Sequence, residues 1–116
     1  MSMDRESARA VRVAKALSDP TRYELLRCIA AAGEINCRDL TTRFAVSQAT
    51  VSHHLKILSD AGLLRTRREG QFHYFSLTPG ALPGHAAALA RAFARVPAER
   101  TRKPAAPSRP RRRRAA

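Results

Sequence analysis

The sequence has few of the features that mark membrane or secreted proteins. No run in its 116 residues approaches the ~18 apolar residues that a membrane span needs. Two cysteines are too few for a disulfide framework. The first residues mix charges, whereas a secretion signal has a basic segment followed by an apolar one. We therefore expect a cytoplasmic protein with no membrane partner.

Recognisable catalytic constellations are also missing. The sequence contains no glycine-rich phosphate loop, no nucleophile beside a plausible base and no carboxylate pair in a cleft-like context. Its length fits one small domain and leaves no room for a separate catalytic domain. We expect a protein that is not an enzyme and that requires no cofactor.

Acidic residues are scarce, with 9 Asp and Glu against 22 Lys and Arg, which gives a formal net charge of +13. Residues 97–116 hold eight of the basic residues, one acid and four of the seven prolines. We expect residues 1–96 to fold as one domain and residues 97–116 to form a disordered basic tail. Such a tail neutralises nucleic-acid phosphates without reading sequence, or serves only as a solubilising end.

Apolar spacing and turn residues predict five helices before the tail. Asp19, Asn36 and Ser47 are each placed to cap a helix, and Gly33 and Gly62 are placed to end one. The expected helices span residues 5–17, 20–32, 36–45, 48–61 and 83–96.

The helix expected at residues 48–61 has an apolar stripe and a polar face without an acid before Asp60. Val51, Leu55 and Leu58 form the stripe. The polar face carries Gln48, Ala49, Thr50, Ser52, His53, Lys56 and Ser59. Surface helices commonly pair Glu with Lys, so a face without carboxylates suits approach to a polyanion. A merely solvated face is the alternative.

Two β-rich runs follow, at residues 63–67 and 72–77, and Gly70 supplies the positive φ for the turn between them. Arg67, Arg68 and Gln71 lie at the tip of this hairpin. A basic hairpin directly after a helix-turn-helix is the winged-helix layout, in which the second helix enters the major groove. The sequence thus predicts a mainly α fold with a small β-hairpin.

The last expected helix carries an apolar stripe of Leu82, Ala86, Leu89 and Phe93. So small a domain has little core for that stripe to cover. The first and last helices are therefore a candidate homodimer face. Packing within one chain is the alternative.

Several of these segments together resemble the ArsR/SmtB family of winged-helix repressors. The matching segments are ALSDPTR at residues 16–22, QATVSHHLKIL at 48–58, AGLL at 61–64 and RREG at 67–70. The resemblance implies a bacterial homodimeric repressor that binds an imperfect palindrome in double-stranded DNA. It also implies that an inducer, which the sequence does not identify, releases the DNA.

The resemblance places the DNA-binding helix pair at residues 36–44 and 47–61. It assigns DNA contacts to Ser47, Gln48, Thr50, Ser52, His53, Lys56, Arg67, Arg68 and Gln71. Gln48 is the best candidate base reader, because an amide can bond an adenine edge at two points. We expect His54 to be packed and hydrogen-bonded, and Arg22 to form an intramolecular salt bridge in preference to a phosphate contact.

The family's metal ligands have no counterpart here. Thiolate-sensing members carry two cysteines one residue apart, where this chain has Asn36 and Arg38. Zinc-sensing members use Asp and His pairs on the last helix, where this chain has only His85. We therefore expect no metal site. Cys28 is expected to be a small buried hydrophobe and Cys37 the more reactive thiol; a thiol sensor made of both is the alternative.

Two rival functions stay open at this point. One is a sequence-indifferent architectural protein, held to DNA mainly by its charge. The amide and hydroxyl groups of the expected recognition helix argue against it, since they would be wasted without base contacts. The other is a ligand-sensing or protein-interaction module with weak DNA binding, against which the acid-free helix face argues.

Overall fold

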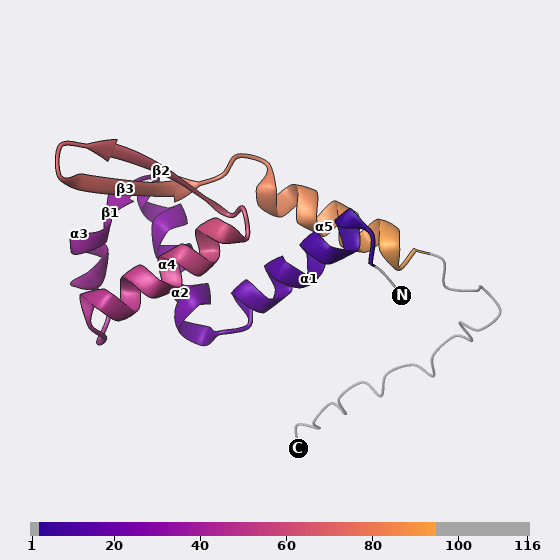
Figure 1. The fold of residues 1–116 in the computed structure, drawn as a ribbon, viewed down its shortest axis with the longest axis horizontal. Helices are drawn as coiled ribbons and strands as arrows, with labels where there is room; N and C mark the ends of the chain where they lie inside the picture. The colour runs from indigo at the N-terminus through magenta and orange to yellow at the C-terminus, as the bar shows by residue number, and fades with distance from the viewer. Residues whose placement is uncertain (1–2, 95–116) are drawn as a thin grey trace, which may run out of the picture.

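The computed structural model describes residues 3–94, so the tail predicted at residues 97–116 lies outside the described part. The elements follow in the order α1, α2, β1, α3, α4, β2, β3 and α5. Helices α2, α3 and α4 and the sheet form a body, on which the C-terminal half of α1 packs through Val13 and Ala16. The N-terminal half of α1 and α5 form an arm that projects from this body (Figure 1). The prediction of a mainly α fold with a small hairpin is confirmed.

Helices α1 (Arg5–Leu17) and α2 (Pro20–Ala32) have the predicted bounds. The Asp19 carboxylate caps α2 by accepting the backbone N–H of Arg22 at 3.0 Å. That hydrogen bond, which favours the charged carboxylate, lowers the pKa of Asp19. Gly33 follows α2 with a φ of 83°, a conformation that glycine adopts without strain.

Helix α3 (Cys37–Thr41) is shorter than the predicted helix, which ran to Ala45. Its predicted cap is present: the side chain of Asn36 accepts the backbone N–H of Asp39 at 2.8 Å. At its other end the hydroxyls of Thr41 and Thr42 donate to backbone carbonyls one turn back, each at 2.7 Å. Such side-chain bonds offer the backbone an alternative to continuing the helix.

Helix α4 (Gln48–Asp60) ends one residue before its predicted end. The hydroxyl of Ser47 caps it by accepting the backbone N–H of Thr50 at 3.1 Å. The predicted apolar stripe of Val51, Leu55 and Leu58 is buried in the core. The polar face of α4 lies opposite this buried stripe and therefore points outward.

Strands β2 (Leu64–Glu69) and β3 (Phe72–Leu77) form the predicted hairpin. Because Glu69 pairs with Phe72, the turn has two residues and not the four that were predicted. Gly70 opens this turn with a φ of 63°. Strand β1 (Ile35–Asn36), which was not predicted, pairs antiparallel with β3.

Helix α5 (Ala81–Ala92) begins two residues earlier than predicted. Pro83 fits inside its first turn, where the missing N–H would have no helical partner. Within the described range α5 has no buried residue, and Leu89 and Phe93 are 38% and 73% exposed. An ion pair of 2.6 Å between Glu6 and Arg91 joins it to α1. No helix among residues 3–94 is long and apolar enough to cross a membrane.

Candidate nucleic-acid interface

A groove of about 630 Å³ lies between α4 and the hairpin of β2 and β3. Four of the nine predicted DNA-contact residues line it: Gln48, Ser52, Lys56 and Gln71. The structure thus brings polar side chains from the recognition helix and from the hairpin turn to one surface. Hydrogen-bonding groups of this kind serve both phosphate and base contacts.

The N-terminus of α4 opens onto this surface. Gln48, Ser52 and His53 are exposed there, and the first turn of the helix carries no acid. Ser47 and Thr50 are engaged with each other, because the Ser47 hydroxyl also bonds the Thr50 hydroxyl at 3.0 Å. The unpaired N–H groups at a helix N-terminus carry partial positive charge, which favours a phosphate.

Lys56 forms an ion pair with Asp60 across one turn of α4, with 3.2 Å between Nζ and the carboxylate. Both side chains are largely exposed. Exposed pairs of this spacing contribute little stability in water, about 0.3–0.5 kcal/mol. Lys56 can therefore exchange Asp60 for a phosphate at small cost.

Arg67, which is predicted to contact DNA, forms intramolecular ion pairs while its side chain stays half exposed. Its guanidinium bonds both carboxylate oxygens of Glu34 at 3.0 Å and one of Glu69 at 2.7 Å. It also lies over the Tyr74 ring, 4.6 Å from the ring centre. The bonds from Arg67 lower the pKa of Glu34 and raise that of Arg67 itself.

Arg67 therefore links the wing to the segment that leads into β1. Because Glu34 is distant from Arg67 in the sequence, no local pattern predicted this contact. Arg68 and Gln71 are also exposed near the hairpin turn. The DNA contacts of all three wing residues stay a prediction.

Arg22 and His54 link α1 to the recognition helix. Arg22 donates to the backbone oxygens of Ala16 at 2.7 Å and Lys15 at 3.2 Å, and its Nη1 lies 3.3 Å from Nδ1 of His54. The prediction of a packed, hydrogen-bonded His54 is confirmed. The predicted salt bridge of Arg22 is wrong, because its partners are carbonyl oxygens at the C-terminal end of α1, where a cation is favoured.

Two further residues line the groove that were not predicted. Arg38 lies over the Phe72 ring at 5.9 Å from its centre, and His73 is opposite Arg68 in the hairpin. His73 is a polar residue between the aromatic residues Phe72 and Tyr74 in β3, and this pattern could have identified it as an exposed position. Arg38 had no such signal, because its position depends on the packing of α3 against the sheet.

The two cysteines contact different partners. The thiol of Cys37 lies in the groove, 3.7 Å from the hydroxyl of Ser52. Cys28 accepts a weak hydrogen bond from Arg43 at 3.6 Å. Among residues 3–94, no three His, Cys, Asp or Glu side chains gather closely enough to hold a metal ion. A thiol sensor made of both cysteines stays a prediction.

Comparison with known proteins places this geometry in a family. A family model of a helix-turn-helix domain matches residues 17–67. The transcriptional repressor SdpR of Bacillus subtilis is 42% identical over 65 residues, which cover 56% of this chain and 71% of SdpR.

Solved structures agree with the sequence matches. An ArsR-like transcriptional regulator from Rhodococcus sp. RHA1 superposes with a TM-score of 0.68 at 30% identity, over 75% of this chain and 81% of that one. The homodimeric winged helix-turn-helix DNA-binding domain Mb0332 of Mycobacterium bovis, a possible ArsR-family regulator, gives a TM-score of 0.62 at 27% identity, over 83% and 92% of the two chains. The chain therefore belongs to the ArsR/SmtB family of winged helix-turn-helix DNA-binding transcriptional regulators.

Proposed function

We propose that the protein is a homodimeric repressor that reads a palindromic operator and is released from it by an inducer. The observation that carries this proposal is the groove between α4 and the wing. Gln48 and Ser52 supply base-reading groups from α4, and Gln71 and Arg68 supply the wing. The similarity to a named transcriptional repressor supports the same conclusion.

A second copy of the chain fits the exposed side of the arm. Val11 on α1 and Leu89 and Phe93 on α5 are large apolar side chains that are 43%, 38% and 73% exposed. The related Mb0332 domain is a homodimer. A two-fold dimer presents two recognition helices, which read two half-sites about one DNA turn apart.

Residues 97–116 have a separate part in this proposal. Their eight basic residues add phosphate contacts that carry no sequence information. Removal of residues 101–116 should flatten the salt dependence of binding and leave the preference between operators unchanged. A loss of that preference would instead make this segment a reader of sequence.

The decisive experiment compares two fluorescent duplexes by anisotropy across a range of salt. One duplex comes from the region upstream of the protein's own gene, and the other has the same composition in scrambled order. We expect a preference for the first of ~10³-fold or more, as specific regulators show. Equal binding that falls steeply with salt would favour the architectural alternative.

A matched pair of variants tests the groove directly. Gln48→Ala should reduce the discrimination between the two duplexes by about 1–3 kcal/mol, because it removes a base contact. Arg27→Ala, on an exposed position of α2 outside the groove, should leave the ratio unchanged. Equal losses in both variants would mean that the loss in Gln48→Ala is not specific to the groove.

A further inference from the structure

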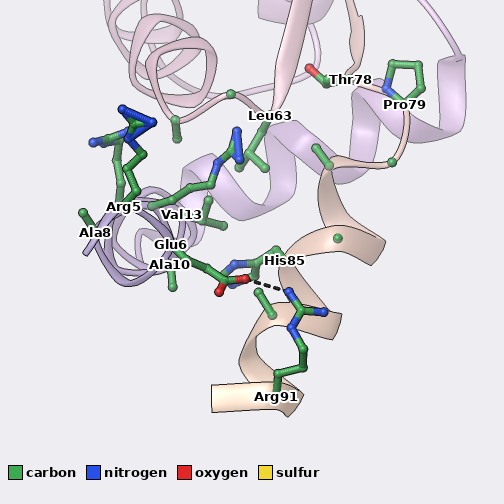
Figure 2. Close-up of a pocket in the computed structure, with 18 residues that line it drawn as sticks. Arg5, Glu6, Ala8, Ala10, Val13, Leu63, Thr78, Pro79, His85 and Arg91 are labelled. Carbon is green, nitrogen blue, oxygen red and sulfur yellow. Dashed lines mark hydrogen bonds and ion pairs between the residues drawn. The ribbon is translucent and has the colours of Figure 1, made fainter. Parts of the chain in front are cut away.

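A second and larger cavity, of about 990 Å³, lies between α1, α5 and the loop that follows α4 (Figure 2). The charged and ionisable residues that line it are Arg5, Glu6, Arg9, Arg12, His85 and Arg91. The rest of its lining is uncharged and mostly small. Four arginines against one carboxylate leave a formal excess of three positive charges.

Arg5, Arg9 and Arg12 of α1 line the cavity with exposed side chains. Arg5, Arg9 and Arg12 follow the helical spacing that ends at Ala16, which is 1% exposed in the core. They continue the core-facing stripe of α1 beyond the body. Figure 2 shows Glu6 and His85 between the two helices, with Glu6 joined to Arg91 by the 2.6 Å ion pair.

The N-terminus of α5 adds positive potential to the same space. Gly80, Ala81 and Gly84 line the cavity, and within the described range no side chain caps this helix. The first turn of α5 carries no acidic residue. Uncapped N–H groups favour an anion. A side chain at Gly84 would meet nothing within 4 Å, so space is open there.

The cavity lies away from the DNA groove and does not include the exposed apolar residues of the proposed dimer face. The exposed apolar residues Val11, Leu89 and Phe93 are not among the described residues that line it. It touches Ala61 and Gly62, at the C-terminal end of α4, whereas DNA reading is proposed for the N-terminal end. The 13 residues of α4 put about 20 Å between those ends.

We propose that this cavity binds a small molecule with two or more carboxylate or phosphate groups, and that this polyanion is the inducer. The inducer role rests on the proposed repressor function. Guanidinium groups bind carboxylate and phosphate oxygens in pairs, and the cavity has the size of a small-molecule site. The anion competes with Glu6 for Arg91 and so changes how α5 is joined to α1.

The lining also connects the cavity to the DNA-binding elements. Leu63, which is buried, follows α4 and precedes β2, and its carbonyl accepts the N–H of Thr78 at 2.9 Å. Both residues line the cavity. A shift of α1 and α5 around a bound anion therefore reaches the end of the recognition helix and the base of the wing together.

Binding is tested first, with citrate and inorganic pyrophosphate as probes and the full chain without DNA. The histidine ring signals in NMR spectra report the place of binding, because His85 lines this cavity and His73 lines the DNA groove. We expect both probes to shift the His85 signals at millimolar concentrations. No shift at His85 with either probe would overturn the proposal.

A charge-matched pair of variants makes this result specific. The double variant Arg9→Gln, Arg12→Gln should weaken probe affinity by about 10-fold or more, because two charge-assisted contacts are lost. The control Arg5→Gln, Arg27→Gln removes the same charge but only one cavity residue, so its loss should be smaller. Equal losses would assign the binding to net charge and would overturn the site.

Release of DNA is tested with the same proteins at constant ionic strength. Pyrophosphate or citrate should lower operator affinity by about 10-fold in the unchanged protein and by less than about 2-fold in Arg9→Gln, Arg12→Gln. Equal weakening in both proteins would overturn the inducer role. A double variant that loses operator affinity without any probe would place these arginines at DNA and overturn the proposal.

Failure of the repressor proposal gives a different signature. In that case the unchanged protein shows no operator preference even without a probe, whereas the His85 titration still decides whether the cavity binds the anion. The altered arginines are exposed, so we expect unchanged far-ultraviolet circular dichroism in every variant.

Discussion

The body and the arm are held together by different means. In the body, Leu25, Ile29, Leu40, Val51 and Leu58 are completely buried. In the arm, α5 has no buried residue in the described range, and an exposed ion pair joins it to α1. Burial of apolar area supplies most of the folding free energy, whereas exposed ion pairs supply little. The body therefore specifies its own fold, and the arm presents surface for a partner.

The largest expected effect contrasts two leucines, one from each region. Leu58→Ala in the body should lower the free energy of unfolding by about 2–5 kcal/mol, because it leaves a cavity in the core. In the monomer, Leu89→Ala in the arm should lower it by no more than about 1 kcal/mol, since that side chain is partly exposed when no partner covers it. Urea denaturation at a protein concentration below the dimer dissociation constant measures both, and similar losses would contradict the comparison.

The next effect concerns association. Phe93→Ser should raise the dimer dissociation constant about 100-fold, since a two-fold interface contains the residue twice and each burial contributes at least about 1.5 kcal/mol. Tyr23→Ser removes an exposed aromatic ring from α2 in the body and should leave the constant unchanged. Analytical ultracentrifugation measures both dissociation constants. An unchanged constant in Phe93→Ser would mean that the dimer forms through another interface.

A smaller effect separates stability from DNA binding in the body. Ser47→Ala should cost about 1 kcal/mol of stability, because α4 loses its cap. Ser47→Asp keeps a capping oxygen and should restore the stability, but its charge should repel phosphate and weaken operator binding. Thermal unfolding and anisotropy together test this, and equal operator affinity for the two variants would remove Ser47 from the interface.

The smallest effect concerns an exposed ion pair at the edge of the body. Arg67 lowers the pKa of Glu34 from its ordinary value of 4.5 in the folded chain, so their bond stabilises the fold above that value. The contribution disappears as the pH falls through the lowered pKa of the folded state. Carboxyl NMR should place the midpoint for Glu34 below 4.5 and, in Arg67→Ala, back near 4.5. An unchanged midpoint in Arg67→Ala would contradict the ion pair between Arg67 and Glu34.

Local signals in the sequence predicted most of the body. Asp19, Asn36 and Ser47 cap helices through backbone groups three residues away, so the residue type and the local pattern were sufficient. Strand β1 was missed because it has only two residues and pairs with β3 across a long stretch of chain. A two-residue strand has no periodicity of its own.

In the candidate site too, features of a single element were predictable and contacts between distant segments were not. The acid-free face of α4 is a property of one helix, and it identified Gln48 and Ser52, which line the groove. The partner of Arg67 could not be predicted, because Glu34 meets it only after the sheet has formed. The cavity of the arm was missed for the same reason, since its arginines and the N-terminus of α5 come from opposite ends of the folded domain.

The contacts that Arg22 makes with α1 and α4 have a consequence for the spacing of the two operator half-sites. Its guanidinium bonds the last turn of α1 and touches His54 in the middle of α4. In a dimer joined through α1 and α5, this side chain and the packing of α1 on α4 together set the angle between the two-fold axis and each recognition helix. The half-site spacing that the dimer can bind thus depends on this angle. A tilt of a few degrees at Arg22 would put the second recognition helix out of phase with the DNA turn.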